Sequence, residues 1–480
     1  MLLALAVGLP LAFALAAFAT PSERLRPWLI PAAALVQLPV DAWLIASGER
    51  FAPERASWLG LDALGALLLG WLALYFACCA CYAPAYLRLR AERPNRIFCA
   101  VLLLLFAMMS FFAIAQHVGL MWIAIEATAL AAAPLLYFNH NRRSIEATWK
   151  YLLTGSVGIA IALLGSFFLG YSALHAGLQT SLVIGDLVAH GPELSRPWLH
   201  AAMALLVIGY GTKLGAAPMH TWKPDAYGEA PGLVGALLAG GSTSCAFVAI
   251  LRFHGVCVAA GEGAFARELL LAFGLLSIAV GGVFMVRQRD YKRMIAYSSV
   301  EHVGILLLGT AIGGAGLFGA LLHMFGNGLT KGVLFLSAAN IHRHFGSRST
   351  HDVRGALRVL PRSTLMFVLG FLAATGAPPF APFLSELTIL RAAVAGGQLG
   401  VAALFLGLLF LVFVAMGAVV LGLAQGDALE SEAAAPVRER LAQYAPIAAL
   451  LGLALLLGVW IPEPLEDALW SAARLIEGVR

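Results

Sequence analysis

The sequence contains few charged residues for its length. Asp, Glu, Lys and Arg make up 12% of the 480 residues, whereas about a quarter is usual in soluble domains. Hydrophobic residues make up 61%, and the mean hydropathy is +0.86. This composition excludes a soluble globular protein and indicates a polytopic membrane protein.

Cysteine is also scarce, and the common motifs of cofactor sites are missing. The CCAC run at 78–81 has the wrong spacing for an iron–sulfur or zinc site. The sequence contains no Walker loop, zinc ribbon or dinucleotide-binding fingerprint. We therefore expect packing roles for the cysteines, and no cofactor or metal in this chain. The six cysteines are Cys78, Cys79, Cys81, Cys99, Cys245 and Cys257.

Long apolar runs recur along the whole chain, separated by short polar loops. A membrane-spanning helix needs about 20 apolar residues. The first run has no basic segment ahead of it, so we expect a retained helix and not a cleavable signal. The sequence predicts an all-α membrane protein with about fourteen spans, near residues 2–20, 27–46, 58–82, 97–115, 117–138, 150–171, 198–217, 231–253, 268–286, 294–313, 315–341, 363–390, 399–424 and 444–461.

The basic residues are distributed unevenly between the two sets of loops. Of the 31 Lys and Arg residues, 21 lie in loops after odd-numbered spans and 7 lie on the opposite side, including the C-terminal end. Cytoplasmic loops carry the excess of Lys and Arg. We therefore expect both termini outside, and a net charge of +5 that reflects orientation and not nucleic-acid binding.

Two spans are interrupted in a similar way, the seventh (GYGTKLGAAPMHTW) and the twelfth (AATGAPPFAPFLSELTIL). Glycine and proline free backbone carbonyls, which are tolerated in a membrane only beside protein or water. Five spans separate the two breaks, so spans 4–8 and 9–13 would form inverted repeats. This predicts a three-helix segment at 1–96, half-channels at 97–260 and 261–425, and a cytoplasmic loop with a C-terminal helix at 426–480. Gly and Pro are also common in ordinary membrane helices.

The first predicted half-channel contains one acid and one amine inside apolar spans. Lys213 lies in the interrupted seventh span, and an ionised amine at membrane depth costs roughly 2.5–3.5 kcal/mol. Glu126 is about nine residues from either end of the fifth span, near mid-depth. We hypothesise that Glu126 keeps Lys213 protonated.

The second predicted half-channel is richer in ionisable residues. His323, Asn327 and Lys331 are spaced by four, which places them along one face of a helix that could line a hydrated path. Histidine and lysine suit proton relay, although a single buried histidine is also a common structural residue. The candidates are Glu301 and His302 in the tenth span, His323 and Lys331 in the eleventh, and Glu386 in the twelfth.

The loop after the seventh span, HTWKPDAYGEAPG, is polar and rich in turn residues. Its ionisable residues, His220, Lys223, Asp225 and Glu229, either gather protons at the mouth of a channel or form a solvated turn. Near the end of the eighth span, we expect Arg252 to extend to the membrane interface.

Six ordered motifs cover roughly residues 95–425: WIAIEAT, EATWKYLLTGSVG, GTKLGAAPMHTWKPDAYGEAPG, RDYKRMIAYSSVEHVG, HMFGNGLTKGVLFL and GAPPFAPFLSELTIL. Together they resemble the antiporter-like proton-channel subunits of respiratory complex I and its relatives. SSVEHVG and EATWKYL are most similar to component F of hydrogenase-4 and formate hydrogenlyase complexes, the group 4 nickel–iron hydrogenases.

The resemblance implies roles for individual residues. Glu126 matches the fifth-helix glutamate of the family, and Lys213 matches its seventh-helix lysine. Lys331 corresponds to a relay lysine with His323 beside it, and Glu386 to the twelfth-helix residue that opens toward the outside. Two departures are the lack of a lysine in the eighth-span segment GGSTSCAFVAIL, and an asparagine where relatives carry a second histidine.

The sequence thus predicts a proton-translocating membrane subunit, without catalytic residues of its own, of a hydrogenase-4-like or NADH-quinone-oxidoreductase-like complex. The expected partners are other membrane subunits and a peripheral redox arm, in the inner membrane of a bacterium. One alternative is a subunit of a multisubunit Na⁺/H⁺ antiporter. Another is the proton channel of an inorganic-carbon uptake complex.

Overall fold

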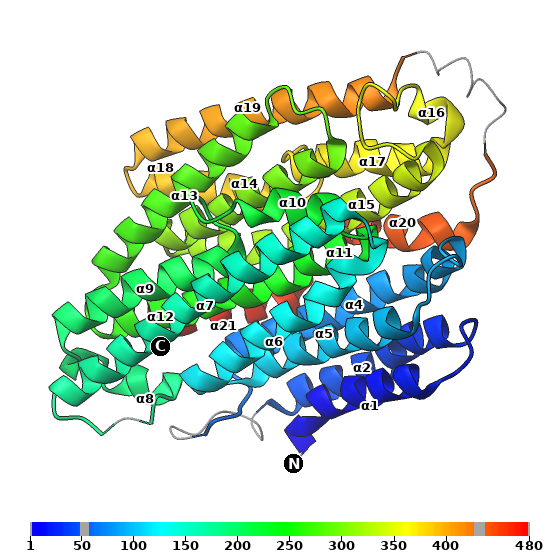
Figure 1. The fold of residues 1–480 in the computed structure, drawn as a ribbon. Helices are drawn as coiled ribbons and strands as arrows, with labels where there is room; N and C mark the ends of the chain where they lie inside the picture. The colour runs from blue at the N-terminus through cyan, green and yellow to red at the C-terminus, as the bar shows by residue number, and fades with distance from the viewer. Residues whose placement is uncertain (1, 49–56, 180, 427–436, 479–480) are drawn as a thin grey trace.

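The computed structural model describes residues 2–48, 57–179, 181–426 and 437–478 (Figure 1). Within these ranges the chain consists of helices and loops, and its β pairing is limited to three isolated bridges. The expected all-α architecture is confirmed. Arg50, Arg55 and Arg480, which contributed to the comparison of loop charges, lie outside the described residues, as do residues 427–436 of the predicted cytoplasmic loop.

Most helices are long and run side by side across the molecule, from α1 and α2 at one edge to α18 and α19 at the other (Figure 1). In chain order they are η1 (Leu2–Ala4), α1 (Leu5–Ala19), η2 (Arg26–Trp28), α2 (Leu29–Ala46), α4 (Ala63–Leu89), α5 (Arg96–Ile114), α6 (Val118–Leu136), η3 (Tyr137–Asn139), α7 (Arg142–His175), α8 (Ile184–Ala189), η4 (Gly191–Glu193), α9 (Arg196–Leu214), α10 (Trp222–Glu229), α11 (Gly232–Leu237), η5 (Leu238–Ser242), α12 (Thr243–Ala259), α13 (Gly263–Met285), α14 (Tyr291–Ile312), α15 (Ala315–Phe345), α16 (Ala356–Val359), α17 (Pro361–Ala374), α18 (Ala381–Ala395), α19 (Leu399–Ala424), α20 (Leu441–Val459) and α21 (Glu463–Glu477).

Every span expected from the sequence coincides with a helix or a pair of helices. In the described residues, eleven helices are long and apolar enough to cross a membrane by length and composition. The other three expected spans correspond to α9, α15 and the pair α17–α18. These three carry Lys213, the His323–Lys331 face and the second break, whereas Glu126 on α6 and the pair Glu301–His302 on α14 lie in two of the eleven apolar helices.

Both predicted breaks are present, and they are built alike. In the first, α9 ends at Gly215, which has a φ of +80°, and α10 begins seven residues later. In the second, α17 and α18 are separated by a segment that contains Gly376, with a φ of +66°. A Cβ at Gly215 would collide with the Lys223 side chain, and one at Gly376 would collide with Glu386. Each break therefore needs glycine both for its left-handed backbone and to admit an ionisable side chain.

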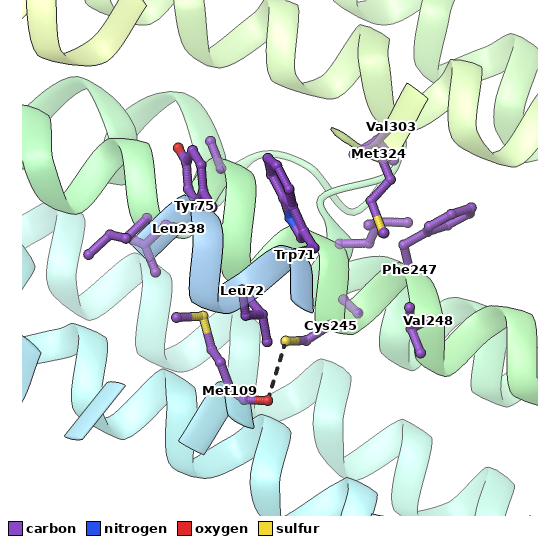
Figure 2. Packing of buried hydrophobic residues seen from close by; sticks show 14 of the residues in the cluster. Trp71, Leu72, Tyr75, Met109, Leu238, Cys245, Phe247, Val248, Val303 and Met324 are labelled. Atoms are coloured by element: carbon purple, nitrogen blue, oxygen red, sulfur yellow. Dashed lines mark hydrogen bonds between the residues drawn. The ribbon is translucent and has the colours of Figure 1, made fainter. Parts of the chain in front are cut away.

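The eighth span is a continuous buried helix with a π-helical turn, η5, in its middle. Trp71 on α4 donates through Nε1 to the carbonyl of Gly240 at 3.0 Å, which gives this carbonyl of the turn a partner. Figure 2 shows Trp71, Leu72 and Tyr75 packed against this helix. Cys245 lies there too, with its Sγ 4.0 Å from the Met109 carbonyl, so this cysteine packs in the core as expected.

The prediction that Arg252 extends to the interface is wrong. Its side chain is buried and forms an ion pair with Asp62 at 3.0 Å. It also donates to the carbonyls of Ala113 and Ala115. The end of α5 and the start of α4 both lie beside Arg252. The buried guanidinium therefore satisfies backbone carbonyls that the end of α5 leaves unpaired, and it joins α12 to α4 and α5.

A last helix, α21, was not expected from the sequence. It packs Leu469, Ala472, Ala473 and Ile476 against the bundle and contacts α4, α12 and α15. Its Trp470 stacks on Phe318 with ring centroids 4.6 Å apart. α21 therefore connects both halves at one end of the bundle. The division of the chain at residues 96, 260 and 425 stays a prediction.

Candidate functional site

Lys213 is buried near the C-terminal end of α9, and its partner is a tyrosine. Its Nζ donates to the Tyr151 hydroxyl at 2.9 Å and lies 4.9 Å from the centre of that ring. Tyr151 comes from α7, which packs along α9. The amine is thus held by a hydroxyl and an aromatic face, a pairing that stabilises a cation.

Glu126 lies beside this amine without touching it. Its Oε1 accepts a hydrogen bond from Ser156 Oγ at 3.1 Å, and its Oε2 is buried without a hydrogen-bond partner. Its charge acts on Lys213 electrostatically, but no ion pair within 4.0 Å joins the two in the described residues. The hypothesis that Glu126 keeps Lys213 protonated stays a prediction, with Tyr151 as the direct contact.

Lys223 lies inside the protein, contrary to its predicted position in a solvated loop. It is 0% exposed, and its Nζ donates to the carbonyl of Leu214 at 2.8 Å and to that of Ser299 at 3.5 Å. Trp222 anchors this end of α10 by donating to the Thr212 carbonyl. The sequence was misleading here because α10 is polar and begins in a turn-rich segment, yet it folds back into the bundle against α7 and α14.

Lys223 connects the two sets of candidate residues. One of its carbonyl partners, Leu214, directly follows Lys213. The other, Ser299, directly follows Ser298, whose hydroxyl accepts from Lys331 Nζ at 2.6 Å. Lys223 and Lys331 are close enough to repel each other electrostatically. Lys223 is thus close to Lys331 and bonds to the carbonyl of the residue after Lys213, and all three lysines are buried. We refer to Lys213, Lys223 and Lys331 as the buried row.

The second half contains a dense cluster around Lys331. His302 and His323 share a hydrogen bond of 2.8 Å between Nδ1 and Nε2, and the other ring nitrogen of His323 bonds to Ser385 Oγ at 2.8 Å. Glu301 is fully buried, with its Oε2 3.6 Å from His302 Nε2. Helices α14, α15 and α18 thus bring these residues together, and the hydrated path along them stays a prediction.

Glu386 extends the cluster toward the second break. It is 6% exposed and lies close enough to Glu301 and Lys331 to interact with both electrostatically. Its Oε1 and both oxygens of Glu301 are buried without hydrogen-bond partners, and so is Asn327 Oδ1 on α15. Buried polar atoms are normally paired with protein or water. These orphaned oxygens therefore favour bound water along this face.

The cluster also contains three side chains with the geometry of a metal site. One ligand atom each from His302, His323 and Glu386 lie within 4.8 Å of one another. However, the two histidines direct their facing nitrogens at each other, and the Lys331 amine acts on both of them. A cation beside that amine would be repelled, so the arrangement suits proton transfer better than metal binding.

The predicted intake loop separates into two parts. His220 is buried like Lys223, with its Nδ1 unpartnered. Asp225 pairs with Lys150 at 2.9 Å and with Arg293 at 3.3 Å, and Glu229 pairs with Arg348 at 2.8 Å. Asp225 and Glu229 also line a surface cavity of about 720 Å³. Of the four loop residues, Asp225 and Glu229 are therefore the two that line a surface cavity, whereas His220 and Lys223 are buried.

Sequence reasoning missed the hydroxyl groups that hold the candidate residues. Tyr151, Ser298 and Ser385 each bond directly to a relay side chain. Their signal was present, because each lies inside one of the quoted motifs. Hydroxyls in apolar helices usually bond their own backbone, so they did not stand out.

Comparisons with known proteins agree with this arrangement. The family described as "NADH:quinone oxidoreductase/Mrp antiporter, TM" matches residues 115–412. The chain is 35% identical over 352 residues to the hydrogenase-4 component F homolog of Methylacidiphilum infernorum. The aligned region covers 72% of each chain. It is 33% identical over 331 residues to NADH-quinone oxidoreductase subunit N of Desulforudis audaxviator, covering 68% of this chain and 65% of that one.

A solved structure shares the whole fold. The Mrp complex from Dietzia sp. DQ12-45-1b contains a chain that superposes with a TM-score of 0.87 at 22% identity, over 99% of this chain and 97% of that one. This chain thus shares its overall fold with a solved structure, and the family match at residues 115–412 includes Lys213, Lys223 and Lys331. The chain therefore belongs to the NADH:quinone oxidoreductase/Mrp antiporter membrane family.

Proposed function

We propose that this chain translocates protons across a membrane by way of the buried row of Lys213, Lys223 and Lys331. The observation that carries the proposal is the position of Lys223, a buried amine that bonds to the carbonyl of the residue after Lys213 and lies close to Lys331. An amine on a four-carbon stem can rotate between partners and change its protonation when buried. A row of such amines, with water between them, is suited to passing protons in steps.

Lys223 also accounts for the first departure from the family pattern. The eighth span lacks a lysine, and its segment at residues 240–251 is fully buried against α4 and α5. Lys223 reaches the centre from α10 instead. The central position of the row is thus occupied by an amine from a different element.

The buried acids of each half interact electrostatically with the lysine of that half. Glu126 acts on Lys213 in the first half, and Glu301 and Glu386 act on Lys331 in the second. A rearrangement that separates an acid from its amine would favour release of the amine proton. A partner subunit could deliver energy to the row by driving such a rearrangement. The energy needed to move one charge across 100 mV is about 2.3 kcal/mol.

A redox complex is the favoured setting. The two curated relatives are named as a hydrogenase-4 component and as an NADH-quinone oxidoreductase subunit. We infer membrane partner subunits and a peripheral redox arm that carries the cofactors, since this chain is expected to bind none. The orientation follows the loop charges, with both termini outside the inner membrane of a bacterium.

A multisubunit Na⁺/H⁺ antiporter is the second candidate. The family description includes Mrp antiporters, and the structural match is to an Mrp complex. The buried row would serve either function, because both need protons to cross. No observation favours an inorganic-carbon uptake complex, which stays a prediction from the sequence.

Transport by the native assembly tests the proposal. The chain is isolated with its partners, placed in proteoliposomes, and assayed for acidification with a pH-sensitive dye when electron donor and acceptor are added. We expect proton movement that falls by about tenfold or more in Lys223→Met and continues in Lys150→Met, a control with an exposed lysine in an ion pair. Proton movement driven by a sodium gradient without electron transfer would select the antiporter. Full transport in Lys223→Met would overturn the proposed row.

A further inference from the structure

A basic cavity of about 560 Å³ lies at the end of the bundle that the loop charges predict to be cytoplasmic. Glu229 is the one acid among its described lining residues, and Asn139, Asn141 and Asn340 contribute amides. Six cationic side chains line it: Arg90, Arg93, Arg143, Lys292, Arg343 and Arg348.

The convergence of these cations is not explained by membrane orientation alone. Orientation requires basic residues on one side of the membrane, but it does not require them to face one cavity. Here they come from the end of α4 and the loop after it, the start of α7, the start of α14, and the end of α15 with its following loop. Segments far apart in the chain thus deliver positive charge to the same place.

Lys292 is the least solvated of the six. It is 3% exposed, and its Nζ donates to the Ala230 carbonyl at 2.7 Å. No carboxylate lies within 4.0 Å of this amine in the described residues. A buried charge needs compensation by an opposite charge or by hydrogen bonds. One carbonyl leaves most of that need unmet.

Ion pairs neutralise only part of the cavity. Arg348 pairs with Glu229 at 2.8 Å, and Arg90 and Arg343 both reach Glu92, at 2.8 and 3.4 Å. Arg93 donates to the Asn139 carbonyl. Neither Arg93 nor Arg143 pairs with an acid in the described residues, so together with Lys292 three cations lack an ion pair within 4.0 Å.

The neighbouring cavity of about 720 Å³ shows that this excess is local. It shares Arg143, Glu229 and Arg348 with the basic cavity but has as many acids as cations. The two cavities lie on the same face of the protein. Its acids are Glu146, Asp225, Glu229, Asp290 and Asp352, and its cations are Arg143, Lys150, Arg289, Arg293 and Arg348.

We propose that the basic cavity is a binding site for a phosphate-bearing anion. Arginine forks bind phosphate oxygens in pairs, and lysine adds a compact charge. Basic cavities between membrane helices on the cytoplasmic side bind phosphate groups of lipids. The ligand is either such a lipid headgroup or a free phosphate compound. Because the cavity touches the N-terminal segment and both half-channels, the bound anion would also hold these parts together.

Two binding measurements on the purified full-length chain test the site and identify the source of the phosphate. The first is calorimetric titration with inorganic pyrophosphate at fixed ionic strength. The second is native mass spectrometry after incubation with phosphatidylglycerol or, as a neutral comparison, phosphatidylcholine. The variants are Arg93→Gln and the buried Lys292→Met. Arg289→Gln is the matched control, because Arg289 is exposed and lines only the balanced cavity.

We expect saturable binding in one of the two measurements, weakened by about tenfold or more in Arg93→Gln and in Lys292→Met, as the loss of one charged contact implies. Arg289→Gln should bind like the wild type. Equal weakening in Arg289→Gln, or no saturable binding of either probe, would overturn the proposal. So would occupation of the cavity by an acidic protein segment without any affinity for phosphate. Neither result depends on proton transport, so this site and the proposed function can fail separately.

Discussion

The two halves of the buried row differ in how deeply they lie and in how many groups they contain. In the second half, Lys331, Glu301, His302 and His323 are all 0% exposed. The two histidines bond to each other, Glu301 lies 3.6 Å from His302, and Lys331 bonds to the Ser298 hydroxyl. In the first half, Lys213 has one hydroxyl partner, and the bond between Ser156 and Glu126 is solvent-exposed in the isolated chain.

The position of the helices explains this difference. The second cluster lies on α14 and α15, which are surrounded by other helices, whereas Glu126 and Ser156 lie on α6 and α7, near the outer surface of the bundle. Leu153, Val157 and Phe167 on α7 are each 62% exposed on that surface. The first half is thus accessible to lipid or to a partner subunit, while the second half can exchange protons only through the protein.

Removing the amine of the second half should have the largest effect. In Lys331→Met, we expect proton transport to fall by about 100-fold, because the cluster loses its only mobile cation and transfer through a buried group is lost. The measurement is the initial rate of acidification in proteoliposomes at matched protein content. Transport above half the wild-type rate would show that the second half has another route.

Lys223→Met tests whether the halves are connected. We expect a loss of about tenfold or more, since proton transfer between Lys213 and Lys331 would need to cross a longer gap. Lys223→Arg keeps the charge, and it should fold but recover little transport because a guanidinium does not release its proton. Equal transport in Lys223→Arg and wild type would contradict a role in proton exchange and leave only a charge effect.

Glu126→Gln should have a smaller effect, because Glu126 acts on Lys213 from a distance and is partly solvated. We expect a loss of about fivefold, which corresponds to about 1 kcal/mol of screened attraction. The loss should shrink at high salt, since exposed charges are screened. An effect as large as that of Lys331→Met would mean that this outer surface is covered and desolvated in the assembly.

The smallest change is expected for Tyr151→Phe. It removes the hydroxyl that accepts from Lys213 while keeping the ring, so about 1 kcal/mol of hydrogen bonding is lost and transport falls about two- to fivefold. Ser298→Ala makes the equivalent change at Lys331. If the first half is the more solvated, Ser298→Ala should be the more harmful of the two, because water can replace the Tyr151 hydroxyl more easily.

The sequence was sufficient for the broken helices and for the charges that lie within apolar spans. Lys213, Lys331 and Glu386 were predicted because the cost of a charge in lipid makes each of them conspicuous. Gly215 and Gly376 were predictable as breaks, although not as the glycines that admit Lys223 and Glu386.

The positions of Lys223 and Arg252 were not predictable, for the same physical reason. Both lie in segments whose local composition resembles a solvated turn or a membrane boundary, and only long-range packing brings them inside. Helix α21 was missed because it is amphipathic and too short to span a membrane. A local sequence pattern shows which face of a helix is apolar. It does not show which distant helices pack over that segment and bury its polar residues.

Ordered water between the three amines tests the central claim most directly. We predict that a map of the intact complex that resolves water will show hydrogen-bonded molecules joining Lys213 to Lys223 and Lys223 to Lys331, with further water on the unpaired oxygens of Glu301 and Asn327. Dry, close-packed side chains between Lys223 and Lys331 would contradict a proton route through this row.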